Sequence, residues 1–239
     1  MRSIKDKYYN IYYDSVPAAG KKVNEDYIRV EKNEKDGHII IIADGVSSSL
    51  MPSHWAKILV DNIIYSPSSE YFLRNFKSAV NEFNVFLEQK KSIGSRLFLE
   101  KIKRDKYGSS TILVCNLNKD SLDGSNIGDT IPFILSGNKI EFLNEYLHKQ
   151  ELDKLVPNQV MSKIDQVFKC IDFGPYKKSG IFFLATDAVA HMIRHKDKVF
   201  ADKLIDALKK DKFNKFIEDK RFNGEIQNDD SSIVVIEIK

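Results

Sequence analysis

Short apolar runs recur along the chain and predict a structure built largely from β-strands. The clearest run lies within Gly37 to Ser49, where four isoleucines and an alanine lead directly into Asp44-Gly45. A short run of this kind, rich in β-branched residues, is typical of a strand buried on both faces. Similar or alternating runs predict further strands at 8–13, 26–31, 109–117, 131–135, 139–143, 165–173, 181–185 and 231–238, with a short strand within 123–130.

Helical spacing of apolar residues marks two blocks, one between the strands and one after most of them. The first block predicts a helix over 55–64 with Ser53 as its N-cap, a longer helix over 72–87, and a further helical turn or two within 92–103. The second block runs from Asp187 to about Phe222, whereas 144–160 has no strong period and is helical or irregular.

Grouped strands and segregated helices favour an α+β fold with antiparallel sheet over a regular βαβ repeat. The sequence shows no internal repeat, low-complexity tract or linker that would divide it. We therefore expect one domain spanning 1–239.

Composition excludes several classes of partner. The net charge is only +3, so we expect neither nucleic acid nor a membrane as the main partner. Acidic residues interrupt the basic stretch from Arg194 to Arg221, which predicts solvated helix faces there. No apolar run is long enough to span a bilayer, and the first ten residues lack the apolar core of a secretory signal. Cys115 and Cys170 lie in apolar runs without metal-ligand spacing, which predicts buried, reduced thiols. The expectation is a cytoplasmic monomer.

Acidic residues fall at predicted strand ends or tight turns, which is the feature with the clearest chemical meaning. If these ends meet at one edge of a sheet, the carboxylates would repel one another unless a cation lay between them. Oxygen-only ligands suit magnesium or manganese better than zinc. The alternative for Asp44-Gly45 is a plain turn, since Asp-Gly is a common turn dipeptide. The residues concerned are Glu25, Asp26, Asp44, Asp129, Asp187, Asp229 and Asp230.

Six short motifs containing these residues occur in a recognisable order. They are NED at 24–26, ADG at 43–45, GSST at 108–111, GDT at 128–130, ATD at 185–187 and DDSS at 229–232. In this order the chain resembles the metal-dependent serine/threonine phosphatases of type 2C (the PPM family) in their bacterial form, over residues 20–238. The resemblance implies a four-layer α-β-β-α sandwich, with two antiparallel sheets, helices packed outside each sheet, and metals at one end between the sheets.

The resemblance also implies a role for each acidic residue. Asp44 would bridge two divalent cations, manganese or magnesium, and the Gly45 carbonyl and Glu25 would serve one of them, with Asp26 in support. Asp187 and Asp229 would hold the other cation, and Asp129 would join Asp187 at an optional third. Asp230 would have a supporting role only. The catalytic residues would then be Asp44, Asp187 and Asp229.

Four departures from the family pattern bear on mechanism. Lys21 stands where the family commonly has the arginine that binds the substrate phosphate, and a lysine offers a point charge in place of a bidentate fork. Val46 replaces a histidine proposed as general acid; His54 and His191 are the nearest substitutes, although a lone histidine is more often structural. Ala188 replaces the usual glycine, and 144–164 shows no recognisable flap.

The activity implied is hydrolysis of phosphoserine and phosphothreonine by attack of a metal-bridging hydroxide. The partners implied are a phosphorylated protein substrate and a cognate serine/threonine kinase. One alternative is a pseudophosphatase or regulatory phosphoprotein-binding module on the same fold; another is a different oxygen-ligated metal hydrolase. Because no expected ligand is lost, the sequence favours an enzyme.

Overall fold

Two antiparallel sheets form the centre of the molecule in a computed structural model, which describes residues 2–33, 37–64, 69–105, 107–119, 121–143, 159–163, 166, 170–176, 180–194 and 196–239. The first sheet has the strand order β1 (Arg2–Lys5), β2 (Tyr9–Val16), β12 (Ser231–Ile238), β11 (Gly180–Ala185), β7 (Ile131–Ser136) and β8 (Lys139–Phe142). The second has the order β10 (Ile171–Tyr176), β6 (Leu122–Ile127), β5 (Ser109–Leu117), β4 (His38–Gly45) and β3 (Tyr27–Lys32), with β9 (Val160–Met161) paired to β5.

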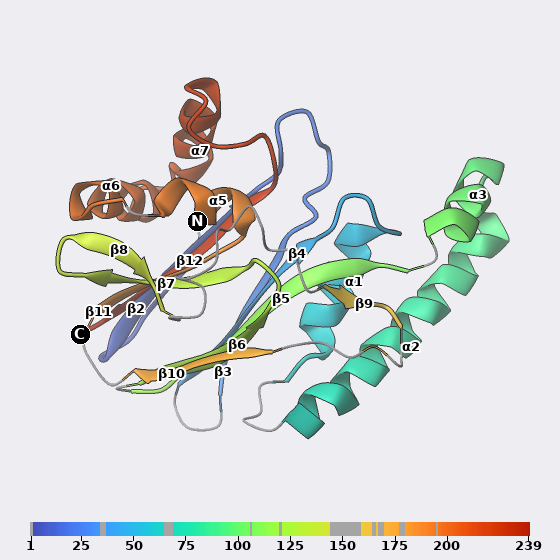
Figure 1. The fold of residues 1–239 in the computed structure, drawn as a ribbon, viewed down its shortest axis with the longest axis horizontal. Helices are drawn as coiled ribbons and strands as arrows, with labels where there is room; N and C mark the ends of the chain where they lie inside the picture. Colours follow the sequence, from blue (N-terminus) through green and yellow to red (C-terminus); the bar gives the residue numbers. More distant parts are fainter. Residues whose placement is uncertain are drawn as a thin grey trace.

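Helices cover the outer face of each sheet, so the layers run helix, sheet, sheet, helix (Figure 1). Over the first sheet lie α5 (Asp187–Ile193), α6 (Lys198–Lys209) and α7 (Phe213–Phe222). Beside the second sheet lie α1 (Pro52–Asn62) and α2 (Ser69–Ile93), with α3 (Arg96–Asp105) following α2. The predicted four-layer α+β sandwich is confirmed.

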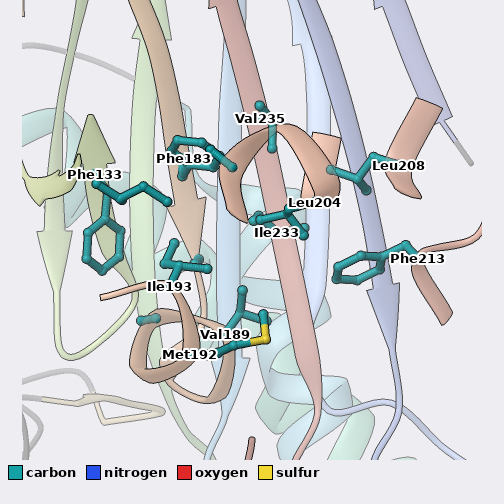
Figure 2. Close-up of a cluster of buried hydrophobic side chains, with 14 of the residues drawn as sticks. Phe133, Phe183, Val189, Met192, Ile193, Leu204, Leu208, Phe213, Ile233 and Val235 are labelled. Carbon is teal, nitrogen blue, oxygen red and sulfur yellow. The ribbon is translucent and has the colours of Figure 1, made fainter. Parts of the chain in front are cut away.

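Three apolar cores separate the layers. In β4, Ile40 and Ile42 face the core between the sheets, while Ile41 and Ala43 face α1 and α2. Successive side chains of a strand point to opposite faces, so a strand covered on both sides must be apolar throughout. This explains the unbroken isoleucine run. Figure 2 shows the third core, where side chains of β7, β11 and β12 pack against α5 and α6.

Several predicted elements end elsewhere than expected. Ser53 is not the N-cap, because α1 begins at Pro52, whose fixed φ suits the first helical position, and Met51 precedes it with a left-handed φ of 51°. The strand predicted at 165–173 overlaps β10 only at 171–173, because pairing with β6 sets the ends of β10 at Ile171 and Tyr176; of its earlier part, 165 and 167–169 lie outside the described residues. The helical block after Asp187 is divided into three helices.

Other differences concern exposed or undescribed positions. The strand β1 was not predicted, because it is mostly exposed and pairs with β2 alone. Cys115 is buried as expected, but Cys170 is exposed, which contradicts the prediction of a buried thiol. The prediction for 144–160 falls largely on 144–158, which lies outside the described residues. No helix in the described part of the chain is long and apolar enough to cross a membrane.

Trp55 offers a test of the core between the second sheet and its helices. Its side chain is fully buried, contacts the rings of Phe76 and Phe83, and donates from Nε1 to the Val160 carbonyl at 2.7 Å. We expect Trp55→Ala to lower the free energy of unfolding by about 3–5 kcal/mol, measured by urea unfolding followed by circular dichroism. Phe222→Ala is the control, because that side chain is 92% exposed; an equal loss in both variants would contradict the packing described.

Candidate metal centre

The acidic strand ends meet because the registers of the two sheets align them. In the second sheet, Tyr27 is opposite Ala43, which puts Glu25-Asp26 and Asp44-Gly45 at the same end. In the first sheet, Ala185 is opposite both Ile131 and Ile233. The residues just beyond these positions, Asp129, Asp187 and Asp229-Asp230, therefore share one end of that sheet.

Hydrogen bonds tie the ends of the two sheets together. Thr186, which follows β11, donates from Oγ1 to Asp26 Oδ2 at 3.1 Å. Asp230, which precedes β12, accepts from the Glu25 backbone N–H at 2.7 Å and from the Ala18 N–H at 2.6 Å. Its side chain is only 3% exposed, so Asp230 holds two loops in place.

Gly45 is required by a close approach of backbone segments. Its N–H donates to the Glu25 carbonyl at 3.1 Å. A Cβ atom at this position would lie 2.7 Å from that carbonyl oxygen and 2.9 Å from the carbonyl oxygen of Pro52. Any larger residue would push the β4 end away from the loop before β3, and so would separate Asp44 from Glu25.

Four carboxylates, which we name the aspartate group, are linked by electrostatic interactions through Asp44 and Asp187: Asp26, Asp44, Asp129 and Asp187. The charges of Asp230 and Asp229 also act on Asp26 and Asp187, respectively. Burial raises the pKa of Asp26 to about 7 and that of Asp187 to about 6, and neighbouring carboxylates add to both rises. Burial, then the charges of Asp26, Asp187 and Asp129, raise the pKa of Asp44 well above its usual range. Burial also raises the pKa of Asp129.

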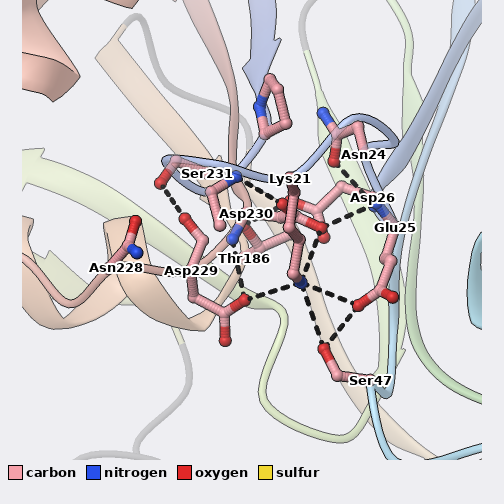
Figure 3. A network of polar contacts seen from close by, with 12 residues as sticks. Lys21, Asn24, Glu25, Asp26, Ser47, Thr186, Asn228, Asp229, Asp230 and Ser231 are labelled. Carbon is pink, nitrogen blue, oxygen red and sulfur yellow. Dashed lines mark hydrogen bonds and ion pairs between the residues drawn. The ribbon is translucent and has the colours of Figure 1, made fainter.

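The remaining carboxylates surround Lys21 (Figure 3). The Lys21 Nζ lies 2.9 Å from Glu25 Oε2, 3.4 Å from Asp230 Oδ2 and 3.5 Å from Asp229 Oδ1, and we name these three acids the lysine rim. Partial burial by itself lowers the pKa of Lys21, but the hydrogen bond to Glu25 and the charges of the rim outweigh it, and the pKa rises. Lys21 is therefore charged and is shared among carboxylates.

The donor set suits a hard divalent cation, although the side chains do not form a closed cage. Among the described residues, no three Asp, Glu, His or Cys side chains are gathered as a ready metal-ligand set. Asp26 Oδ1, however, is buried without a hydrogen-bond partner, and no ion pair from the described lysines and arginines reaches the aspartate group. A divalent cation stabilises buried carboxylates whose negative charge no basic side chain balances.

The histidines considered as general acids have other surroundings. His54 stacks on Phe86 with ring centroids 4.5 Å apart, and burial lowers its pKa. His191 lies on α5 one turn after Asp187, and its charge slightly offsets the rise in the Asp187 pKa. His54 therefore has a packing role, and of the two histidines it is His191 that lies next to the aspartate group.

Three contributors to this end of the sandwich were missed by sequence reasoning. Arg221 of α7 donates to the carbonyls of Pro17 and Asp229, at 2.9 and 2.5 Å. Thr186 joins the two sheets, and Ser47 donates to Glu25 and accepts from Lys21. Thr186 and Ser47 lie within or next to the acidic motifs and could have been found there. Nothing local to Arg221 distinguishes it from the exposed basic residues of the same stretch.

Comparison with solved structures finds the same fold in bacterial phosphatases and in RsbX. The serine/threonine phosphatase Stp1 from Staphylococcus aureus is 12% identical, with a TM-score of 0.66 over 96% of this chain and 94% of that chain. The S. agalactiae serine/threonine phosphatase is 13% identical, with a TM-score of 0.64 over 97% and 100%. RsbX in complex with magnesium is 12% identical, with a TM-score of 0.57 over 100% and 99%.

This chain has the fold of those phosphatases. No family model and no curated protein matches the sequence. At such low identity the likeness concerns the fold alone, and the function must be argued from the residues at the site.

The raised pKa values predict how stability depends on pH in the metal-free protein. A carboxyl group whose folded pKa is raised stabilises the fold fully below its unfolded value, near 3.9, and loses that contribution as the pH rises through the folded value. With folded pKa values of about 7 for Asp26 and about 6 for Asp187, the free energy of unfolding in EDTA should fall between about pH 4 and pH 7.

The same argument predicts that Asp44→Asn makes this pH dependence shallower and raises stability at pH 7 by about 1.4 kcal/mol per unit of pKa shift relieved. Urea unfolding across the pH range, in EDTA, measures both effects. Asp202→Asn, on the exposed face of α6, is the control and should follow the wild type. A slope unchanged by Asp44→Asn would show that the aspartate group does not carry the repulsion described.

Proposed function

We propose that this protein is a divalent-cation-dependent phosphatase that hydrolyses phosphoserine and phosphothreonine in proteins. The observation that carries the proposal is that Asp44, Asp129 and Asp187 lie within electrostatic range of one another at one end of the sandwich, and that no ion pair with a described lysine or arginine balances them. The fold supports it, since solved structures sharing that fold are titled serine/threonine phosphatases, and one is titled as a magnesium complex.

In this proposal the carboxylates hold manganese or magnesium. Asp44 would reach two cations, Asp187 and Asp229 would share one of them, and Asp129 with Asp187 would serve an optional third. The Gly45 carbonyl and Glu25 would complete the other cation site, with Asp26 in support. Bound there, the cations supply Lewis-acid activation of the attacking water and neutralise charge on the phosphoryl oxygens.

The protein's own groups prepare this site in three ways. Asp26 and Asp187 retain protons up to pH values near 7 and 6 in the absence of a cation, so cation binding near neutral pH would release protons. Thr186 and Asp230 fix the two sheet ends at a set separation. Lys21 donates to Glu25, Ser47 and Asp230 and could contact a substrate phosphate only by exchanging one of these partners.

Two observations favour the alternative, a regulatory phosphoprotein-binding protein on the same fold. The Lys21 ammonium already neutralises part of the site, and the described acidic side chains do not form a ready ligand set. Catalysis distinguishes the two functions, because a binding module would hold phosphopeptide without releasing phosphate. A kinase partner, a monomeric state and a cytoplasmic location remain predictions.

The enzyme proposal predicts manganese-dependent release of phosphate from p-nitrophenyl phosphate and from a phosphothreonine peptide. Asp44→Asn and Asp187→Asn should each lower kcat/KM on the order of a hundredfold or more while the fold persists, because each removes a ligand charge. Asp202→Asn is the control and should retain full activity. Near-normal turnover by either variant with manganese present would refute these roles.

Binding of a cation should also stabilise the folded protein. Manganese at a hundred times its Kd adds about 2.7 kcal/mol to the free energy of unfolding, which for a chain of this size raises Tm by roughly 5–10 °C. Differential scanning calorimetry with and without EDTA measures the shift. Asp44→Asn should show little or none of it, and a shift of equal size in that variant would place the bound cation elsewhere.

A further inference from the structure

Lys21 uses its whole hydrogen-bonding capacity within the acidic end of the sandwich. An ammonium group has three N–H donors and no acceptor. The Lys21 Nζ donates to Glu25 Oε2 at 2.9 Å, Ser47 Oγ at 3.2 Å and Asp230 Oδ2 at 3.4 Å, and Asp229 Oδ1 lies 3.5 Å away. Its surroundings consist of oxygen atoms, three of them from carboxylates, as a hard cation would require.

The loop that carries Lys21 is held in place by the same acids. The Lys21 N–H donates to the Ala18 carbonyl at 3.0 Å, and the Ala18 N–H donates to Asp230 Oδ1 at 2.6 Å. The next N–H, of Ala19, donates to Asn228 Oδ1 at 2.7 Å. The ammonium is therefore presented from a fixed backbone, and only 31% of the side chain is exposed. An ordinary solvated surface lysine would show neither feature.

Charge is distributed unevenly between the two acidic sets. The lysine rim, Glu25, Asp229 and Asp230, has one resident positive charge. The aspartate group has no ion pair with any described lysine or arginine, and it contains the unpartnered, buried Asp26 Oδ1. At the aspartate group a divalent cation thus meets no competing ion pair from a described lysine or arginine, but at the rim it meets an ammonium.

We propose that Lys21 is a resident counter-ion that competes with a divalent cation for Glu25. The Lys21 Nζ lies 2.9 Å from Glu25 Oε2, so a cation held by Glu25 would lie within a few ångströms of the ammonium, and like charges at that distance repel strongly. The contact of Lys21 with Asp229 Oδ1 is longer, at 3.5 Å. The protein would therefore bind one cation tightly at Asp44, Asp187 and Asp229, while the second, at Asp44, Glu25 and the Gly45 carbonyl, binds weakly because Lys21 must first leave Glu25. The inference rests on the proposed function, since it concerns the same metal centre.

Manganese titration of the purified full chain tests this directly, by calorimetry and by electron paramagnetic resonance of free manganese. The wild type should bind one ion tightly and a second at least tenfold more weakly. Lys21→Met removes the charge and keeps the aliphatic stem, so the Kd of the second ion should fall roughly tenfold or more. Lys21→Arg keeps the charge and should resemble the wild type. Lys22→Met is the matched control, because the neighbouring Lys22 is exposed.

A second measurement needs no metal. In EDTA, Lys21→Met leaves the rim without its counter-ion, so Tm should fall, whereas Lys22→Met should leave it unchanged. If Lys21→Met does not fold, Lys21→Gln is titrated with manganese in its place, because glutamine keeps a hydrogen-bond donor without the charge.

The possible outcomes separate this inference from the proposed function. Two equally tight manganese ions in the wild type, unchanged by Lys21→Met, would overturn the competition and leave the phosphatase proposal standing. No manganese binding to any variant would overturn both. A tighter second ion in Lys21→Met alone would support the inference, whatever the activity of the loaded enzyme.

Discussion

Repulsion among buried carboxylates is the constraint on which the acidic end of this molecule depends. Burial and mutual charge raise the pKa values of Asp26, Asp44 and Asp187 together, so at neutral pH the metal-free site stores unfavourable free energy. The protein tolerates this because the sheets that carry these residues are buried on both faces and cannot separate to relieve it. In the proposed function, a divalent cation bound among these carboxylates would relieve the repulsion.

The three apolar cores keep the buried carboxylates close together, because they fix the registers of the strands. Because each sheet is packed on one side against the other sheet and on the opposite side against helices, a one-residue slip of a central strand would exchange the side chains that fill its two cores and disrupt the packing of both. The registers that place Ala43 opposite Tyr27, and Ala185 opposite Ile233, are therefore strongly specified. Hydrogen bonds from Thr186 and to Asp230 then join the two aligned ends.

Within this rigid frame the acids form two unlike sets. One has no ion pair with a described lysine or arginine, and the other shares the Lys21 ammonium. The difference follows from where each acid lies in the fold. Glu25 and Asp230 adjoin the loop that carries Lys21. Asp44 lies at the end of β4, and Asp187 is the first residue of α5. A single lysine side chain on an anchored loop cannot serve both sets, because its three donors are already used.

The sequence by itself determined the fold class, most strand positions and the acidic residues at the strand ends, because these depend on local periodicity and on turn chemistry. It could not determine where α1 starts, because Pro52 sets that position. Nor could it determine the limits of β10 or the presence of the exposed β1, because these depend on pairing with β6 and with β2, respectively. Only the tertiary structure decided that the acids converge, that Arg221 joins loops distant in sequence, and that Lys21 lies among carboxylates. The physical reason is that charge interactions depend on distance in space, which local sequence patterns do not encode.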